Sequence, residues 1–360
     1  MPEPIRVLIV DDSPFMRRAI SSLLEGEDDI KVAGTAKDGQ DAIRQIQDIK
    51  PDIVTMDIEM PVMDGLAALK IIMEKFPLPV IMLSSLTEEG AKETLDALDI
   101  GAADYLPKNL SNVSLNILKV KADLVEKIRA ITAKKYIFGI RRNNHFSQEH
   151  HEYPKTPHFE ENKIISKNNR IDIVAIGSST GGPKALQDVI PKIPENFPVP
   201  IILVQHMPKA FTGSFAERLS SMSKIKVIEA AGDEIVKPGT AYLSPGDKHL
   251  SVVKAGRDGV RINLSNEPAD LINRPSVSVM MESAAKEYPG KVLGVVLTGM
   301  GSDGLLGMKK IKETGGKTIA QDEATCVVYG MPKAVVDAGI ADIILPIYKI
   351  GDEIIKETIC

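Results

Sequence analysis

Short apolar runs alternate with amphipathic stretches along the first part of the chain, and this alternation constrains the fold more than any other feature. The runs are candidate strands at residues 5–10, 31–36, 52–56, 79–84 and 103–107. Strands that alternate with helices form a parallel sheet covered by helices. The sequence therefore predicts an N-terminal α/β domain built on a five-stranded parallel sheet.

Polar residues stand where these strands stop. Asp11 and Asp12 follow the first strand, Asp57 follows the third, Ser84 ends the fourth and Lys108 follows the fifth. The carboxyl ends of parallel strands form a ligand crevice, and three carboxylates there repel one another unless a cation such as Mg²⁺ lies among them. Lys108 offers a positive charge to an incoming anion. Singly these residues are ordinary caps and turn formers, but together they predict a site.

A polar segment at residues 139–169 divides the chain in two. It has little aliphatic periodicity and contains Pro154 and Pro157, which favours a linker. The segment holds His145, His150, His151 and His158. Clustered histidines can bind metal, but no cysteine and no helical spacing accompanies them, so a solvated linker is the favoured interpretation. The predicted division is a first domain at 1–138, a flexible linker at 139–169 and a second domain at 170–360.

Composition excludes several classes of protein. The chain has 360 residues, 43% of them hydrophobic and 26% charged, which is enough for two globular cores. A net charge of -5 gives no support for nucleic-acid binding. There is no apolar run of roughly 18 residues and no secretory leader pattern. Cys326 and Cys360 are the only cysteines, and Cys326 lies in an apolar run typical of a core. We expect a cytoplasmic protein without membrane insertion or a nucleic-acid partner.

The stretch IGSSTGGPKAL at residues 176–186 predicts a strand, a turn and a helix. The strand occupies 171–177, the helix starts at Pro183, and residues 178–182 form the turn. This layout exposes a nucleophile or cradles a phosphate. A P-loop requires Gly-Lys followed by Ser or Thr, whereas this sequence has Gly-Gly-Pro-Lys. The stretch taken alone leaves both interpretations open.

Two further predicted strands are also followed by a polar residue, a histidine in one case and an aspartate in the other. His206 ends the strand within residues 198–208, and Asp303 follows the strand within 292–304. A serine hydroxyl needs an imidazole to accept its proton, and the imidazole needs a carboxylate to orient it. Singly, Ser179, His206 and Asp303 are common caps and turn residues. Jointly they predict a triad in an order, Ser-His-Asp, unlike that of the α/β-hydrolases.

His249 is the other histidine of the second half. It lies in SPGDKHLSVV, which predicts a turn that enters a strand. A surface role is the simpler expectation for it, and contact with a substrate is the alternative.

The first half resembles the receiver domains of response regulators over about its first 125 residues. The matching features are VDDS (10–13), MDIEMPVMDG (56–65), Ser84 and Lys108. The resemblance implies a flavodoxin-like domain in which Asp57 accepts a phosphoryl group from a histidine kinase. It also implies that Asp11, Asp12 and Asp57 bind Mg²⁺, while Ser84 and Lys108 contact the phosphoryl oxygens. Asn109 departs from the family, which usually has proline after the lysine, and this departure concerns the local backbone.

The second half resembles the effector domain of the chemotaxis protein-glutamate methylesterases, the CheB family. The shared motifs are IGSSTGG, VQHMP, FAERL (215–219), SPGDKHL, NRPSV (273–277), LTGMGSDG and IAQDEATCVVYGMP (319–332). The resemblance implies a doubly wound, mostly parallel α/β domain with Ser179 as nucleophile, His206 as general base and Asp303 as its partner. It implies further that Thr180 assists near the histidine and that the Met300 N–H stabilises an oxyanion. Ser178 stands where the family often has alanine and competes with its neighbour for the role of nucleophile.

The implied reaction is hydrolysis of glutamate methyl esters on the cytoplasmic helices of chemoreceptors, with release of methanol and without a cofactor. Members of this family commonly deamidate receptor glutamines as well. The receiver is expected to cover the active site until a chemotaxis histidine kinase phosphorylates Asp57.

Two other functions compete with this one. A phosphorylation-controlled module that binds a nucleotide or a protein without catalysis also fits the receiver half, but a phosphate cradle requires neither His206 nor Asp303. A transcription factor fits less well, because the second half has no basic helix and no helix-turn-helix pattern.

Overall fold

The structure is a computed structural model that describes residues 3–108, 116–133, 170–256 and 259–359. The predicted linker at 139–169 with its four histidines, Asn109 and Cys360 lie outside the described residues.

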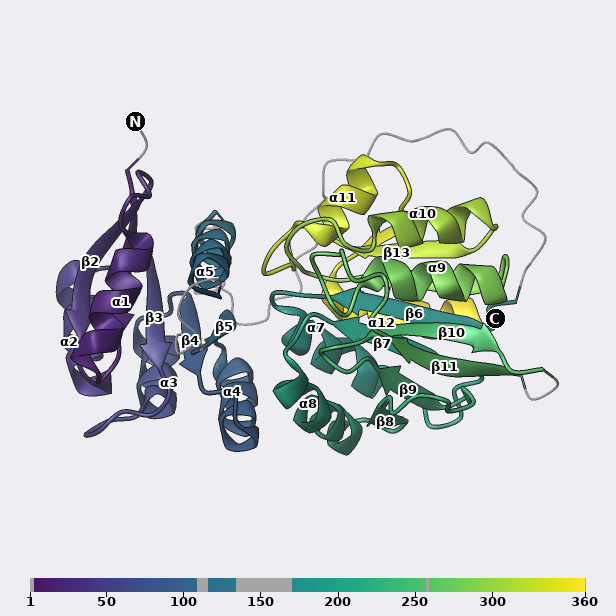
Figure 1. Ribbon diagram of the computed structural model, residues 1–360, viewed down its shortest axis with the longest axis horizontal. Coiled ribbons are helices and arrows are strands. Elements are labelled where there is room, and N and C mark those ends of the chain that lie inside the picture. The colour runs from purple at the N-terminus through teal and green to yellow at the C-terminus, as the bar shows by residue number, and fades with distance from the viewer. Residues whose placement is uncertain (1–2, 109–115, 134–169, 257–258, 360) are drawn as a thin grey trace, which may run out of the picture.

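The first domain contains the predicted five-stranded parallel sheet, with strand order β2-β1-β3-β4-β5 (Figure 1). The strands are β1 (Ile5–Val10), β2 (Ile30–Ala36), β3 (Ile53–Asp57), β4 (Val80–Ser84) and β5 (Asp104–Pro107). The helices are α1 (Pro14–Leu24), α2 (Gly39–Ile49), α3 (Gly65–Lys75), α4 (Glu88–Ile100) and α5 (Asn116–Thr132). Side-chain oxygens cap the first four helices and fix where each begins: Ser13, Asp38, Asp64 and Thr87. The predicted fold of this half is confirmed.

The second domain is built on a seven-stranded sheet with strand order β14-β13-β12-β6-β7-β9-β8. Its strands are β6 (Ile173–Ser178), β7 (Ile201–Gln205), β8 (Lys226–Glu229), β9 (Thr240–Leu243), β12 (Val292–Val296), β13 (Lys317–Gln321) and β14 (Ile343–Leu345). All of its neighbouring strands pair in parallel, as the mostly parallel prediction requires. Strands β10 (His249–Lys254) and β11 (Val260–Ser265) form a separate antiparallel pair.

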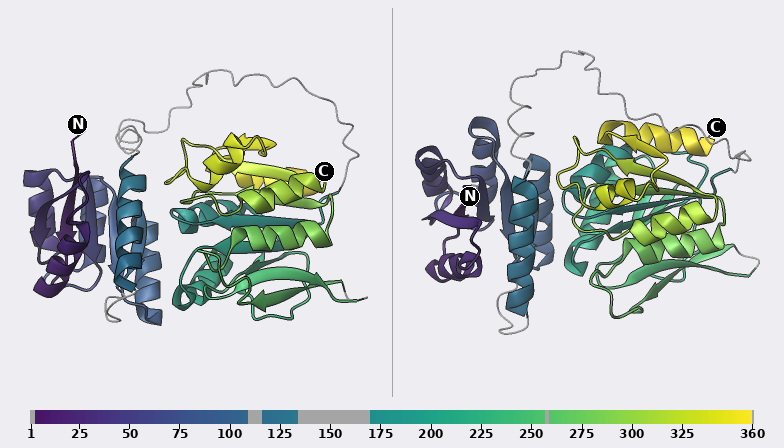
Figure 2. Two further views of the ribbon diagram at one scale, coloured as in Figure 1. Left: turned by 45° about the horizontal axis from the view of Figure 1, so that its top comes forward. Right: turned by 90° about the horizontal axis from the view of Figure 1, so that it is seen from above.

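Helices cover both faces of the seven-stranded sheet (Figure 2). They are α7 (Gly182–Val189), η1 (Ile190–Lys192), α8 (Lys209–Met222), α9 (Val277–Glu287), α10 (Leu305–Glu313), α11 (Met331–Asp337) and α12 (Ile347–Ile359). Alternate residues of β6 enter the two resulting cores, since Val174 and Ile176 belong to one cluster and Ile173 and Ala175 to the other. A strand that is buried on both faces reads as a continuous apolar run, which is why the sequence shows it clearly.

Strand order brings the three predicted triad residues together. Strands β12, β6 and β7 are consecutive neighbours and run in parallel, so the segments that follow them meet at one edge of the sheet. Backbone bonds join these segments directly. The His206 N–H donates to the Ser178 carbonyl at 3.0 Å, and the Ser179 N–H donates to the Thr298 carbonyl at 3.0 Å.

The two domains contact each other through helix α4 and the loops at this edge. Helices α4 and α5 lie on the side of the first domain that faces the second (Figures 1 and 2). The Tyr105 ring stacks on Phe211 of α8 with ring centroids 5.0 Å apart. Arg218 of α8 forms ion pairs with Asp96, at 2.8 Å, and with Asp99 of α4. The contact thus combines an aromatic stack with ion pairs.

Candidate active site

The turn that carries the candidate nucleophile is shorter than predicted. Strand β6 continues through Ser178 and helix α7 begins at Gly182, so the turn comprises residues 179–181 rather than 178–182. Gly181 has φ 74°, in the left-handed region, and a Cβ atom there would lie 2.5 Å from the Val327 Cβ. A glycine is therefore required for this tight turn.

The two adjacent serines have different surroundings. Ser178 is fully buried, and its hydroxyl donates to Gln205 Oε1 at 2.7 Å. Ser179 is partly exposed, and no hydrogen bond engages its hydroxyl in the part of the chain that the structure describes. The Gln205 amide also donates to the Ser179 carbonyl at 2.9 Å and to the His206 carbonyl at 3.0 Å. Gln205 therefore links the turn to the end of the strand that precedes His206, a role that no sequence pattern indicated.

His206 and Asp303 form a hydrogen-bonded pair, with Nε2 of the imidazole 2.9 Å from Oδ2 of the carboxylate. Their side chains are only 15% and 10% exposed, so the pair is largely shielded from water. With Nε2 engaged by Asp303, the other ring nitrogen, Nδ1, is the one left to accept a proton.

Asp303 accepts hydrogen bonds from the imidazole and from four other groups, most of them at the start of helix α9. The donors and their distances are His206 Nε2 (2.9 Å), Val277 N (2.7 Å), Ser278 N (3.0 Å), Gly304 N (2.9 Å) and Ser276 Oγ (2.9 Å). Burial by itself raises the pKa of Asp303. The hydrogen bond and charge of His206 and the α9 amides outweigh burial and hold that pKa well below its usual range. The carboxylate is therefore ionised at neutral pH and fixed in place.

The segment after β12 lies against the turn of the candidate nucleophile. A Cβ atom on Gly299 would lie 2.8 Å from the Ser179 Cβ, so only a glycine allows the two backbones to approach so closely. The Gly299 N–H donates to the Val328 carbonyl at 3.0 Å. The N–H groups of Thr180 and Met300 make no hydrogen bond within the described residues. Two backbone N–H groups adjacent to the turn of Ser179 are thus unengaged within the described residues.

Thr180 is buried, and its carbonyl accepts a hydrogen bond from Thr298 Oγ1 at 2.9 Å. Within the described ranges its hydroxyl makes no hydrogen bond to His206, and its assisting role stays a prediction.

The prediction of a surface role for His249 is wrong. The residue is the first of β10, is 1% exposed and has a partner at each ring nitrogen. Nδ1 accepts from the Ser276 N–H at 3.1 Å, and Nε2 donates to the Pro268 carbonyl at 3.1 Å. The turn that the sequence indicates is present, but the segment before α9 folds over it and supplies the backbone groups that make burial of a polar ring acceptable.

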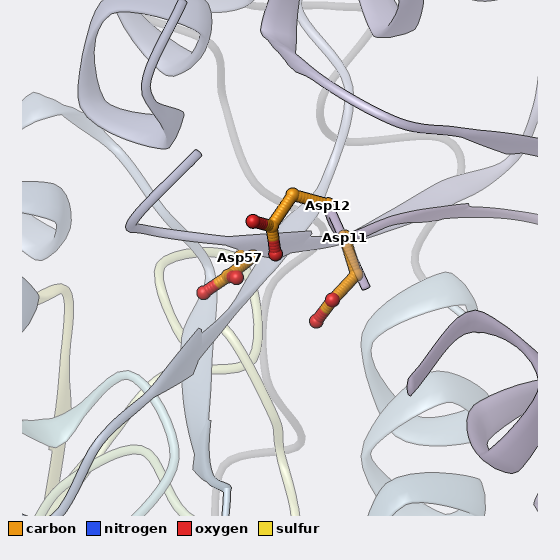
Figure 3. Close-up of side chains that lie close together, drawn as sticks. All are labelled: Asp11, Asp12 and Asp57. Carbon is orange, nitrogen blue, oxygen red and sulfur yellow. The ribbon is translucent and has the colours of Figure 1, made fainter. Parts of the chain in front are cut away.

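The first domain brings together its predicted acidic cluster (Figure 3). Asp11, Asp12 and Asp57 each offer a carboxylate oxygen within 4.8 Å of the others. The Lys108 ammonium lies 2.5 Å from Asp57 Oδ2 and 2.9 Å from Asp11 Oδ2. Burial raises the pKa of Asp57 more than Lys108 lowers it. A cavity of about 260 Å³ is lined by Asp12, Asp57, Ser84 and Lys108.

Ser84 links this cluster to the domain contact. Its buried hydroxyl accepts a hydrogen bond from Thr94 Oγ1 of helix α4 at 2.5 Å. Thr94 also donates to the Gly90 carbonyl at 2.6 Å, within the first turns of the same helix. Helix α4 carries Asp96 and Asp99, the partners of Arg218. The Ser84 hydroxyl therefore connects the acidic cluster to helix α4, which contacts the second domain.

No helix in the described ranges is long and apolar enough to cross a membrane.

Comparison with known proteins identifies both halves. The response regulator receiver domain family matches residues 7–118, and the CheB methylesterase family matches residues 174–354. The chain is 46% identical to the protein-glutamate methylesterase/protein-glutamine glutaminase of Lawsonia intracellularis, over 97% of this chain and 98% of that protein. It is 46% identical to the Thermotoga maritima protein of the same name, over 98% of both chains.

A solved structure agrees with these matches. The crystal structure of the Thermotoga maritima CheB methylesterase catalytic domain shares 49% identity with this chain, at a TM-score of 0.50. The match covers 52% of this chain and 98% of that domain. The chain therefore belongs to the CheB family of protein-glutamate methylesterases/protein-glutamine glutaminases, with a response-regulator receiver domain followed by a methylesterase domain.

Proposed function

We propose that Ser179 is the nucleophile with which this protein hydrolyses glutamate methyl esters on the cytoplasmic helices of chemoreceptors. The Ser179 oxygen attacks the ester carbonyl carbon while His206 Nδ1 accepts the hydroxyl proton. The carbonyl oxygen becomes an oxyanion, and the N–H groups of Met300 and Thr180 stabilise it by about 3 kcal/mol each. Collapse of this intermediate breaks the bond to the methoxy group, which leaves as methanol with the proton held by His206.

The second half of the reaction reuses the same groups. Water attacks the acyl-enzyme carbonyl while His206 accepts a proton, and the Ser179 oxygen leaves with that proton as glutamate is released. A glutamine side chain passes through the same acyl-enzyme, with ammonia as the leaving group in place of methanol. The ionised Asp303 stabilises the imidazolium in each step and is not itself protonated.

The observation that carries this proposal is the 2.9 Å bond between His206 and Asp303, at the same edge of the sheet as the turn that carries Ser179. A module that only cradles a phosphate has no use for an imidazole–carboxylate pair that is largely shielded from water. The full engagement of Ser178 by Gln205 favours Ser179 over its neighbour.

We further propose that Asp57 accepts a phosphoryl group from a chemotaxis histidine kinase. Three carboxylates face a single lysine at this site, and the excess negative charge suits a divalent cation. Asp11, Asp12 and Asp57 would hold Mg²⁺, which supplies neutralisation of the phosphoryl charge when bound. The Asp57 carboxylate attacks phosphorus, and the kinase histidine leaves. Lys108 and Ser84 then contact the phosphoryl oxygens.

The domain contact provides a route from this site to the active site. Met300, Val327 and Val328 of the second domain pack against the core cluster of the receiver, so the receiver contacts the loops that frame Ser179. When Ser84 turns toward a phosphoryl group, Thr94 keeps its bond to the Gly90 carbonyl but loses its bond to Ser84, so helix α4 loses this link to the acidic cluster. Phosphorylation then favours a receiver conformation that docks poorly, with a coupling free energy of about 1–3 kcal/mol. Residues 139–169 serve as the linker that permits this separation.

The deciding experiment is labelling of the full-length chain with a fluorophosphonate probe, with and without acetyl phosphate and Mg²⁺. Labelling should vanish in Ser179→Ala and His206→Ala, survive in Ser178→Ala and increase with the phosphodonor. Methanol release from a methylated receptor fragment should follow the same order. A wild-type chain that is never labelled, even with the phosphodonor, would overturn the triad and favour a binding module.

A further inference from the structure

His249 is a buried histidine that the proposed reaction does not use. Its ring joins two backbone groups, since Nδ1 accepts from the Ser276 N–H and Nε2 donates to the Pro268 carbonyl, both at 3.1 Å. These partners define the tautomer, because an acceptor must face the Ser276 N–H and a donor must face the carbonyl. The ring is therefore neutral, with its proton on Nε2.

Ser276 carries this contact to the active site. It is the N-cap of α9, 2% exposed, and its hydroxyl donates to Asp303 Oδ1 at 2.9 Å. The next two residues, Val277 and Ser278, donate their N–H groups to the same carboxylate at 2.7 and 3.0 Å. Three consecutive residues thus hold Asp303, and the first of them is held by His249.

We propose that His249 is a positioning residue for the triad: its neutral ring fixes Ser276, and residues 276–278 in turn hold Asp303 in place against His206. This inference rests on the proposed function, since it assigns His249 to the same reaction.

The surroundings of His249 favour the neutral ring. Burial lowers the pKa of His249, and the positive charge of Arg274 lowers it further, against the opposing effects of the Pro268 carbonyl, Asp303 and Glu267. Protonation at Nδ1 would set one N–H donor against the Ser276 N–H donor. The ring can therefore hold Ser276 only while it is uncharged.

A histidine that merely stabilises the fold would have different consequences. Its loss would lower the melting temperature and the amount of active enzyme, whatever the state of Asp303. A positioning residue acts through Asp303, so its effect on turnover disappears when the carboxylate is absent.

The test compares His249→Leu with His249→Asn in the full-length chain, with methanol release from a methylated receptor fragment as the readout. Asparagine retains an acceptor oxygen near the position of Nδ1, whereas leucine retains the bulk alone. We expect His249→Leu to lower kcat on the order of 10- to 100-fold with KM unchanged, as a displacement of about 1 Å does. His249→Asn should recover most of that loss.

Thr318→Val is the matched control. Thr318 is fully buried at the start of β13, and its hydroxyl bonds to the Ile340 carbonyl at 2.6 Å and to Asp342 at 2.9 Å, away from the triad. We expect this variant to lower the melting temperature and leave kcat unchanged, which separates loss of stability from loss of positioning.

A double-mutant cycle decides the question. In an Asp303→Ala background, His249→Leu should cause no further loss of kcat or of fluorophosphonate labelling rate. Ser276→Ala deletes one hydrogen-bond donor to Asp303, and it should likewise cause no further loss of kcat in the Asp303→Ala background. This second cycle does not depend on whether the leucine variant folds. Additive losses in the Asp303→Ala background, or an asparagine variant as slow as leucine, would overturn the inference. Failure of the proposed function itself is distinguishable, since the wild-type chain would then not be labelled at all.

Discussion

Each domain places an aspartate that is largely shielded from water at the carboxyl edge of a parallel sheet, but the pKa values of the two aspartates shift in opposite directions. Asp57 shares its site with two other carboxylates and one lysine, and burial raises its pKa. Asp303 is partly buried, with its side chain 10% exposed, but N–H and hydroxyl donors surround it and its pKa is lowered. Burial raises the pKa of both carboxyl groups, but only at Asp303 do the hydrogen-bond donors and the charge of His206 outweigh it. The receiver site is thus suited to a cation and a phosphoryl group, whereas the groups around Asp303 stabilise a single ionised carboxylate.

The largest expected effect is that of Asp303→Asn on turnover. The amide keeps the shape of the carboxylate but loses the charge that stabilises the imidazolium. We expect kcat to fall by about 10⁴-fold, with KM little changed. Methanol release measured at saturating receptor fragment tests this. A loss below tenfold would show that Asp303 does not orient His206.

The corresponding change in the receiver, Asp57→Ala, should leave basal esterase activity intact and abolish its stimulation by acetyl phosphate. The lost stimulation should be about 5- to 150-fold, the usual range of coupling between two sites. Basal and stimulated rates of both chains provide the measurement. Equal stimulation of the variant and the wild type would contradict the role of Asp57.

Replacement of the two aspartates should change the free energy of unfolding in opposite directions. The pKa of Asp303 is lowered in the folded state, so its contribution is present above the unfolded pKa of about 3.9 and is lost as the pH falls below it. Asp303→Asn should therefore lower the free energy of unfolding at pH 7 by about 1–3 kcal/mol, and by less at pH 3.

For Asp57 the sign is reversed, because its folded pKa is raised and its charge costs stability once the pH rises above about 3.9. Asp57→Asn should raise the free energy of unfolding at pH 7 by about 1 kcal/mol without Mg²⁺. Urea unfolding followed by circular dichroism suits a chain without tryptophan. If both variants are destabilised at pH 7, the electrostatic contrast between the sites is wrong.

The smallest expected effect is that of Arg218→Ala at the domain contact. Its ion pairs with Asp96 and Asp99 are partly exposed, and such pairs contribute about 0.2–1 kcal/mol each. Basal activity should therefore rise about two- to fivefold, and high salt should reduce the difference in basal activity between the variant and the wild type. Lys333→Ala, which removes an exposed pair with Asp337 within helix α11, is the control and should change nothing.

Much of both sites could be predicted from local sequence. Buried parallel strands appear in the sequence as apolar runs, and the predicted site residues stand directly after these runs. The five receiver strands and β6 lie within about two residues of their expected positions, and β7 and β12 lie inside the longer stretches 198–208 and 292–304 that predicted them. The boundary error at Ser178 arose because serine commonly forms turns, while here the strand continues one residue further and Gln205 satisfies the hydroxyl.

The sequence by itself determined the two α/β domains, the polar residue at the end of each strand and the residue types that the two sites require. Only the tertiary structure decided which residues support them. His249 looked like a surface residue because the chain segment that buries it ends 27 positions away, at Ser276. Likewise the hydrogen bonds of Gln205, Ser276 and Thr94 form only when strands and helices distant in sequence meet. Hydrogen bonds between such segments leave no periodic pattern, because their partners are set by packing rather than by spacing along the chain.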